Sequence, residues 1–255
     1  MKKLRCLFIA FCLPGFLYAQ VQSPDSLAIK NTNPIKNTNP LKVQALIIPA
    51  VFMTYGALSF GNNPIRDLDL TTKNELQEDH PLFAAHLDNY TQFAPALAVY
   101  ALNFAGIKGK HSLVDATGIY VLSTAIMGGS VSILKKTSHR LRPDGSGYNS
   151  FPSGHTATAF AAAEFLNQEY KDVSPWYGYA GYAVATATGT LRMYNNKHWL
   201  SDVVTGAGIG ILSTKIAYYL YPHVKKLLIG KQTLSYSMVP VYQDKTIGLS
   251  FHGTF

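Results

Sequence analysis

Residues 151–156 read Phe-Pro-Ser-Gly-His-Thr, and an alanine-rich apolar segment follows them directly. Ser153 is a favourable N-cap residue, because its hydroxyl can accept a hydrogen bond from a free N–H group of the first helical turn. Gly154 lacks a side chain, which lets a ligand approach the backbone. The free N–H groups and the positive end of the helix dipole favour a bound anion. We therefore predict a helix start here that is either simply capped or binds an anion to which His155 donates a proton.

Two long cations lie upstream, where another apolar segment ends. Lys135 is followed after six residues by Arg142 and Pro143. Two such side chains near a helix end, with a proline that stiffens the chain, can hold a tetrahedral oxyanion. A basic flank that ends a helix at a membrane surface would have the same composition. The neighbouring Ser-Gly-His sequence favours the oxyanion site.

A third cluster lies downstream, with Arg192, then His198 six positions later, then Asp202 four positions after that. Residues four apart on a helix share a face, so Asp202 can accept a hydrogen bond from one ring nitrogen of His198. The other nitrogen then stays basic and oriented, as in a catalytic triad. A surface histidine–aspartate pair beside a cation is the alternative.

Apolar segments separated by polar loops extend in both directions from these clusters. Charged residues dominate 61–90, a connection that could hold a short amphipathic helix. Residues 233–255 alternate apolar and polar positions and predict two short strands around a turn at 243–245. We therefore expect an all-α fold, a six-helix bundle with a short β-like C-terminal hairpin. The six predicted helices are at residues 43–60, 91–107, 112–134, 155–169, 176–191 and 202–221.

The N-terminus has the features of a secretory signal peptide over residues 1–19, with a basic start and an apolar stretch at 6–18. An uncleaved transmembrane anchor is the alternative. Both cysteines lie in this segment, so cleavage would leave a chain without disulfides or cysteine metal sites. Residues 20–42 contain two near-identical hexapeptides rich in Asn and Pro and predict a polar linker. A helical domain over 43–232 and the strand-like tail over 233–255 complete the predicted organisation.

Composition places the chain between soluble and membrane proteins. Of its 255 residues, 47% are hydrophobic and 14% charged, and the mean hydropathy is +0.06. These values exclude disordered and fibrous proteins. The net charge is +8, and it falls to +5 without residues 1–19, which hold three cations and no acid. Because the cations form short clusters beside apolar segments, they suit phosphate-bearing membrane lipids, and we expect no nucleic acid partner.

The three clusters together resemble the signature of the type 2 phosphatidic acid phosphatase superfamily, which also includes vanadium haloperoxidases and bacterial class A acid phosphatases. That signature reads K-x6-R-P, then P-S-G-H, then S-R-x5-H-x3-D. The resemblance covers about residues 91–221. One position departs from it, because Leu191 stands where the family has Ser, so that the phosphate contact of this hydroxyl is either missing or supplied by another group such as Thr190. The matching positions are Lys135, Arg142, Pro143, Pro152, Ser153, Gly154, His155, Arg192, His198 and Asp202.

The resemblance implies a phosphatase that hydrolyses phosphomonoester or diphosphate groups without a metal or other cofactor. His198 would attack phosphorus and form a phosphohistidine, with Asp202 orienting and charge-balancing it. His155 would protonate the leaving oxygen and then activate the water that resolves the intermediate. The residues that would bind the phosphate oxygens and stabilise the transition state are Lys135, Arg142, Ser153, Gly154 and Arg192.

An apolar and aromatic surround beside a basic site favours an envelope lipid as the substrate. The candidates are lipid A, undecaprenyl diphosphate and lipids of the phosphatidic acid type, and the sequence does not choose among them. Two related activities are alternatives, a vanadate-dependent haloperoxidase and a soluble periplasmic acid phosphatase of broad specificity. A catalytically silent envelope component is disfavoured, because the set of charged motif residues is complete.

We expect an exported, membrane-associated protein whose site faces the periplasm. The sequence does not choose between the inner and the outer membrane. Cations in loops tend to face the cytoplasm, and five lysines lie in loops opposite the three clusters. Glu164, Glu169 and Lys215 would be costly against lipid, so we expect the helices to pack mainly on one another. Residues 43–60 could span the membrane, lie on it or be buried. The five lysines are Lys108, Lys110, Lys171, Lys225 and Lys226.

The remaining histidines are given no role, because they have no partner at metal-ligand spacing. We expect His139 and Arg140, between the two motif cations, to be exposed to solvent; a role in gating or recognising the substrate is the alternative. The histidines without a role are His80, His86, His111, His223 and His252.

Overall fold

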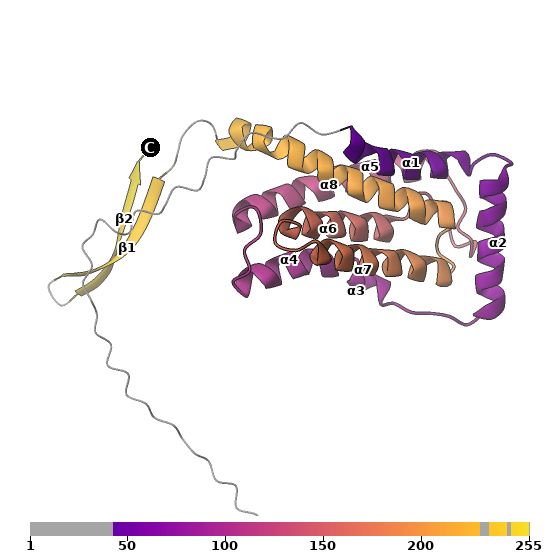
Figure 1. Cartoon of the computed structure of the whole chain (residues 1–255), viewed down its shortest axis with the longest axis horizontal. Helices are drawn as coiled ribbons and strands as arrows, with labels where there is room; N and C mark the ends of the chain where they lie inside the picture. The colour runs from indigo at the N-terminus through magenta and orange to yellow at the C-terminus, as the bar shows by residue number, and fades with distance from the viewer. Residues whose placement is uncertain (1–42, 230–234, 244–245, 255) are drawn as a thin grey trace, which may run out of the picture. The chain divides into compact units, whose positions relative to one another are not determined.

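The computed structural model describes residues 43–229, 235–243 and 246–254 of the chain. The predicted signal peptide (1–19) and linker (20–42) lie outside the described residues. The described part contains eight α-helices and two β-strands, and Figure 1 shows their arrangement. In chain order these are α1 (Gln44–Leu58), α2 (Pro64–Asp79), α3 (Asp88–Thr91), α4 (Ala94–Phe104), α5 (Leu113–Ser138), α6 (Gly154–Tyr170), α7 (Pro175–Tyr194), α8 (Leu200–Ile229), β1 (Ser235–Gln243) and β2 (Thr246–Thr254).

All six predicted helices are present, as α1 and α4 to α8, so the predicted all-α fold is confirmed. The count of six is wrong for the described chain, because the charged connection over 61–90 holds both α2 and the short α3. α2 begins where it does because the side chain of Asn63 accepts hydrogen bonds from the N–H groups of Ile65 and Arg66. Pro64 then suits the first turn, where a backbone donor is not needed.

The predicted C-terminal hairpin is present as well. β1 and β2 pair antiparallel, with Gln243 opposite Thr246. Pro240 lies within β1, opposite Leu249. A proline has no N–H to donate, and it is tolerated here because both strands of a two-stranded sheet are edge strands.

α6 forms the centre of the helical body, with α7 and α8 beside it (Figure 1) and α4 and α5 also in contact. Its buried face is lined with alanines, which lets the neighbouring helices come close. The partner positions on α8 are glycines for a steric reason. A Cβ at Gly210 would lie 2.3 Å from the carbonyl oxygen of Ala157, and one at Gly206 would lie 2.6 Å from that of Ser153.

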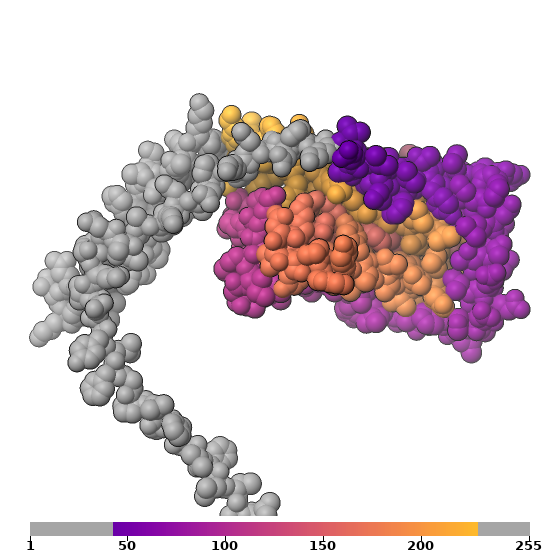
Figure 2. Space-filling model, in the orientation of Figure 1, coloured from indigo at the N-terminus to yellow at the C-terminus, as the bar shows by residue number. Residues whose placement is uncertain are grey.

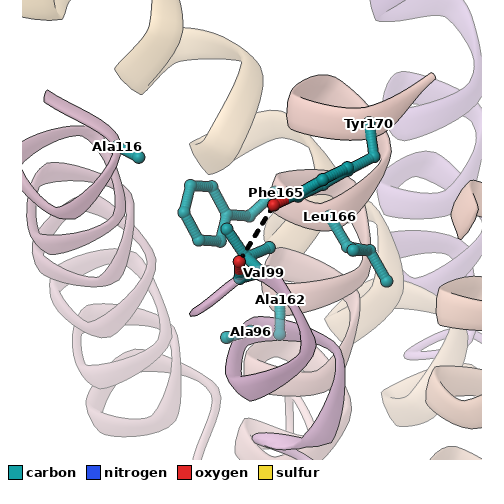
Figure 3. Close-up of a cluster of buried hydrophobic side chains, with 7 residues drawn as sticks. All are labelled: Ala96, Val99, Ala116, Ala162, Phe165, Leu166 and Tyr170. Carbon is teal, nitrogen blue, oxygen red and sulfur yellow. Dashed lines mark hydrogen bonds between the residues drawn. The ribbon is translucent and has the colours of Figure 1, made fainter. Parts of the chain in front are cut away.

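The largest apolar cluster joins α4, α5 and α6 and is drawn in Figure 3. Phe165 stacks against Tyr120 with ring centroids 4.8 Å apart. The hydroxyl of the fully buried Tyr170 donates to the carbonyl oxygen of Val99 at 3.1 Å (Figure 3), so its polar end is satisfied inside the core. This cluster lies toward the C-terminal end of α6, and it leaves the N-terminal end of that helix for the motif residues.

α2 lies across that opposite end of the body, next to the end of α7 and the start of α8 (Figure 1), and its side chains cover that end in the space-filling view (Figure 2). Its side chains reach both helices. Gln77 donates to the carbonyl oxygen of Tyr194 at 3.5 Å, and Asp69 accepts from the N–H of Ser201 at 2.8 Å.

Two helices, α5 and α8, are long and apolar enough to cross a membrane by length and composition. They pack on each other, and Ser123 and Thr214 share a buried hydrogen bond of 2.7 Å between them. As expected, the two glutamates Glu164 and Glu169 of α6 are not turned outward. Glu164 is buried and accepts from Lys215 at 2.7 Å, and Glu169 is buried against His111.

Candidate active site

The three sequence clusters meet at the end of the body where α5 ends and where α6 and α8 begin. Ser153 donates its N–H to the carbonyl oxygen of Asp202 at 3.0 Å, which ties the start of α6 to the start of α8. A Cβ at Gly154 would lie 4.0 Å from Cε of Lys135, so the end of α5 adjoins the same turn. Residues far apart in the sequence are therefore neighbours, as the signature requires.

His198 and Asp202 are paired, but not on one helical face as predicted. α8 begins at Leu200, so His198 lies in the bend before it. Nδ1 of His198 is 3.5 Å from Oδ2 of Asp202 and makes no hydrogen bond within the described residues. The same carboxylate oxygen accepts from the N–H of Trp199 at 3.0 Å, so Asp202 also fixes the turn that carries the histidine.

His198 is only 4% exposed, and Asp202 is fully buried. Burial lowers the pKa of His198, although Asp202 acts in the opposite direction. The imidazole is therefore neutral near pH 7. With Nδ1 turned toward the carboxylate, Nε2 carries the free lone pair and can act as a nucleophile.

Asp202 is held by residues that the signature does not include. Ser150 donates its hydroxyl to Oδ2, and Arg140 donates through Nη1 to Oδ1 at 2.8 Å. The prediction that Arg140 is exposed is wrong, because only 12% of its side chain is accessible. Its position between Asp202 and a second carboxylate explains the burial, since a buried cation requires paired acids.

That second carboxylate is Asp69 of α2, which accepts from Nη2 of Arg140 at 2.6 Å and from the hydroxyl of Ser201 at 2.6 Å. The guanidinium also lies 5.3 Å from the ring centroid of Phe60 and 5.6 Å from that of Trp199. Asp69 is not part of any sequence motif, so the sequence analysis could not identify it. Arg140 carried a weak signal, because it stands between the two motif cations.

Two of the motif cations have unused donors. Nε of Arg142 and Nε of Arg192 are buried and have no hydrogen-bond partner among the described residues. Lys135 donates to the carbonyl oxygen of Asn149. Ser153 caps α6 as predicted, with its hydroxyl accepting from the N–H of Thr156. Buried guanidinium donors without partners are rare in proteins, and they indicate that an anion binds here.

Arg192 has a partner that the sequence analysis did not identify. Its Nη1 donates to Oδ2 of Asp88, a fully buried residue of α3, while Oδ1 of that carboxylate has no partner within the described chain. The next residue, Asn89, contacts His155, with Oδ1 2.8 Å from Nε2 of the ring. Both residues come from the charged connection that was predicted only as a possible short helix.

Burial lowers the pKa of His155 to about 4, and Arg192, His198 and Lys135 act in the same direction, whereas Asp88 opposes them. The side chain is therefore neutral in the ligand-free protein near pH 7.

Leu191 gives the site no hydroxyl, and the suggested substitute is already engaged. Thr190 donates its hydroxyl to the carbonyl oxygen of Thr186 at 3.0 Å, one turn back on α7. His111, given no role above, has a structural one, because its Nδ1 lies 2.7 Å from Oε1 of Glu169.

The family model for the PAP2 superfamily matches residues 116–226, which hold every motif position of the site. Over these residues the chain is similar to the PAP2 superfamily. The predicted superfamily resemblance is thus confirmed. Asp69, Asp88 and Asn89 lie outside the PAP2 match, so their contacts with the site could not have come from the family signature.

Curated relatives of the chain are named lipid A 1-phosphatases. The protein from Porphyromonas gingivalis is 44% identical over 144 residues, which cover 54% of this chain and 31% of the relative. The protein from Rhizobium etli is 31% identical over 138 residues, covering 46% of this chain and 57% of that one. The chain thus matches between about a third and a little over half of the length of these relatives.

Two solved structures are also similar. Aquifex aeolicus LpxE has a TM-score of 0.42 and 22% identity, covering 56% of this chain and 92% of that chain. The first transmembrane PAP2 type phosphatidylglycerolphosphate phosphatase from Bacillus subtilis has a TM-score of 0.44 and 17% identity, covering 74% and 98%.

Proposed function

We propose that this chain is a phosphatase that hydrolyses a phosphomonoester or diphosphate group of an envelope lipid through a phosphohistidine intermediate. The observation that carries the proposal is the pair of buried, unpartnered guanidinium donors on Arg142 and Arg192, close to a buried neutral imidazole. An oxyanion bound by these donors would be held beside a nucleophile.

In the first step, Nε2 of His198 attacks phosphorus and forms the N–P bond. The bond from phosphorus to the leaving oxygen breaks, and that oxygen takes the electron pair and a proton from His155. Asp202 balances the positive charge that develops on the imidazole of His198. Lys135, Arg142, Arg192 and the start of α6 stabilise the charge on the phosphoryl oxygens.

His155 must be protonated to act as an acid, although its pKa is about 4 in the free protein. A bound phosphate dianion resolves this, because it offsets the effect of Arg192 and favours the imidazolium form. In the second step, His155 as a base takes a proton from water, which attacks phosphorus and releases phosphate from His198.

The lipid character of the substrate is supported by the surface and by the relatives. α5 and α8 are candidate membrane helices, and large apolar side chains such as Phe104, Val114 and Trp176 are more than 70% exposed. The relatives named lipid A 1-phosphatases favour a lipid A phosphate among the three candidate substrates.

The proposed site faces away from the cytoplasm. α5 starts near Lys110 and ends next to Lys135 of the site, while α8 starts at the site and ends near Lys225. Lys110 and Lys225, which lie in a loop and in the last turns of α8, are therefore at the end of the body opposite the motif residues. Because positive loops tend to stay in the cytoplasm, the site end would face the periplasm.

The test is phosphate release by the purified chain in detergent micelles from lipid A, undecaprenyl diphosphate, phosphatidic acid and p-nitrophenyl phosphate. We expect turnover of a lipid, a trapped acid-labile phosphoenzyme, and loss of both with His198→Ala. His223→Ala, at an exposed histidine of α8, is the matched control and should keep full activity. Retained turnover in His198→Ala contradicts the phosphohistidine, and equal use of p-nitrophenyl phosphate contradicts lipid specificity.

A further inference from the structure

The short helix α3 brings two polar side chains to the site from outside the family-matched residues. Asn89 contacts the His155 ring, and Asp88 contacts the Arg192 guanidinium. These two side chains are neighbours in the sequence, and their partners come from two different helices, α6 and α7. α3 therefore links the proposed acid to one of the proposed phosphate ligands.

α3 is fixed in place by contacts that do not involve the site. The hydroxyls of Thr91 and Thr188 share a hydrogen bond of 2.9 Å, and Gln92 donates from Nε2 to the backbone oxygen of Asn89 at 2.9 Å. Thr188 and Arg192 are four residues apart on α7 and so share a face. The anchor of α3 thus lies one turn from the guanidinium that Asp88 contacts.

The contact with Asn89 determines which nitrogen of His155 carries the proton. The amide oxygen of Asn89 can only accept, so Nε2 at 2.8 Å is the protonated nitrogen of the neutral ring. Nδ1 then holds the lone pair and is the nitrogen available to exchange a proton with a ligand. Without this acceptor either tautomer could form, and the ring would have no fixed orientation.

The contact with Asp88 leaves part of Arg192 free. The carboxylate occupies Nη1, while Nε stays buried and without a partner in the described chain. An arginine held on one side keeps its planar fork oriented for an oxyanion on the other. The negative charge of Asp88 also acts to raise the pKa of His155. Lys135, Arg192 and His198 act to lower it.

We propose that Asn89 and Asp88 are positioning residues of the active site, Asn89 for the tautomer of His155 and Asp88 for Arg192. The inference rests on the proposed phosphatase function. It adds a fourth segment to the three of the family signature, contributed by the connection between α2 and α4.

The experiment compares pH profiles of kcat for the full chain with the best lipid phosphate from the panel above. His155 is faced by Asp88 on α3, Lys135 on α5, Arg192 on α7 and His198 before α8. Asn89→Asp adds a carboxylate beside Nε2, so the high-pH limb, which reports loss of the protonated acid, should move up by about one pH unit or more. Asp88→Asn removes a carboxylate and should move the same limb down.

Two further variants separate positioning from folding. Asn89→Leu removes the acceptor and should lower kcat at least about tenfold, with little change in KM. Thr91→Val weakens the anchor of α3 but keeps both contacts with the site, so it should lower the melting temperature without shifting the high-pH limb. If Asp88 and Asn89 only stabilised the fold, Asp88→Asn and Asn89→Asp would not shift the high-pH limb in opposite directions. Coincident profiles for the wild type and Asn89→Asp, or near-normal kcat in Asn89→Leu, would overturn the inference.

The two proposals fail in different ways. If the wild type releases no phosphate from any substrate of the panel, the phosphatase function is wrong. If the wild type is active and His198→Ala is not, but the Asn89 and Asp88 variants show the wild-type profile, only the positioning roles are wrong.

Discussion

Arg140 shows how a single residue can organise a site without belonging to its signature. It donates to Asp202 and to Asp69, at 2.8 and 2.6 Å, and also to the hydroxyls of Ser59 and Ser201. Three elements, α1, α2 and α8, are thus joined around the carboxylate that the proposed mechanism needs beside His198. A buried cation with two buried acids is stable only as a complete set.

Arg140→Met should therefore destabilise the chain by about 3–5 kcal/mol, because it leaves two buried carboxylates without their cation. It should also lower kcat, since Asp202 loses the partner that fixes it. Thermal unfolding and phosphate release are the measurements. Lys136→Met removes an exposed cation in the last turn of α5 and serves as the control, with little expected change in either quantity. A stable and active Arg140→Met variant would show that the network is dispensable.

At the scale of elements, the site depends on how closely α8 can approach α6. Gly206 and Gly210 lie against the backbone of α6, which places the start of α8, and with it Asp202, beside the turn at Ser153. The hydroxyl of Thr214 continues the contact, because it donates to the carbonyl oxygen of Ala161 at 3.1 Å. Small residues at this crossing therefore have a functional consequence as well as a packing one.

Gly210→Ala should destabilise the chain by about 1–3 kcal/mol, because the new Cβ meets backbone atoms of α6 that cannot move aside. The melting temperature should fall by roughly 2–4 °C for each kcal/mol. Gly128→Ala on α5 is the matched control, since a Cβ there has nothing within 4 Å. That variant should gain up to about 1 kcal/mol from the better helix former. Equal melting temperatures for the two variants would contradict the tight crossing.

The whole helical body has two chemically different ends. The motif residues, α2 and α3 lie at one end, and the loops with Lys108, Lys110 and Lys171 lie at the other. Between the ends, α5 and α8 offer apolar lengths sufficient to cross a membrane. This polarity underlies the proposed orientation, with the catalytic end toward the periplasm and the lysines toward the cytoplasm.

Labelling of single cysteines with a membrane-impermeant maleimide tests this orientation in intact cells whose outer membrane has been made permeable. Ser146→Cys, in the exposed loop between α5 and α6, should react in intact cells. Lys171→Cys, in the exposed loop after α6, should react only after lysis. The unsubstituted chain measures the background labelling that comes from Cys6 and Cys12. If Lys171→Cys were labelled in intact cells and Ser146→Cys were not, the orientation would be the opposite of the one proposed.

Much of the fold could be predicted because its signals are local. The six long helices follow from the apolar segments, and the start of α6 follows from the capping residue Ser153. α2 was harder to predict, because its sequence is mostly polar and its helix is stabilised by an N-cap and by packing on α7 and α8. The i,i+4 geometry of His198 and Asp202 failed for a similar reason, since the helix starts between them.

The sequence by itself determined which residues carry the proposed chemistry, because their types and spacing match a signature for oxyanion binding and nucleophilic attack. Only the tertiary structure decided what surrounds them: Arg140 and Asp69 around Asp202, Asp88 on Arg192, and Asn89 on His155. The physical reason is that spacing along a chain fixes only contacts within a turn or two. Pairs more than sixty residues apart form only when packing brings α2 and α3 to the end of the body where α6 and α8 begin.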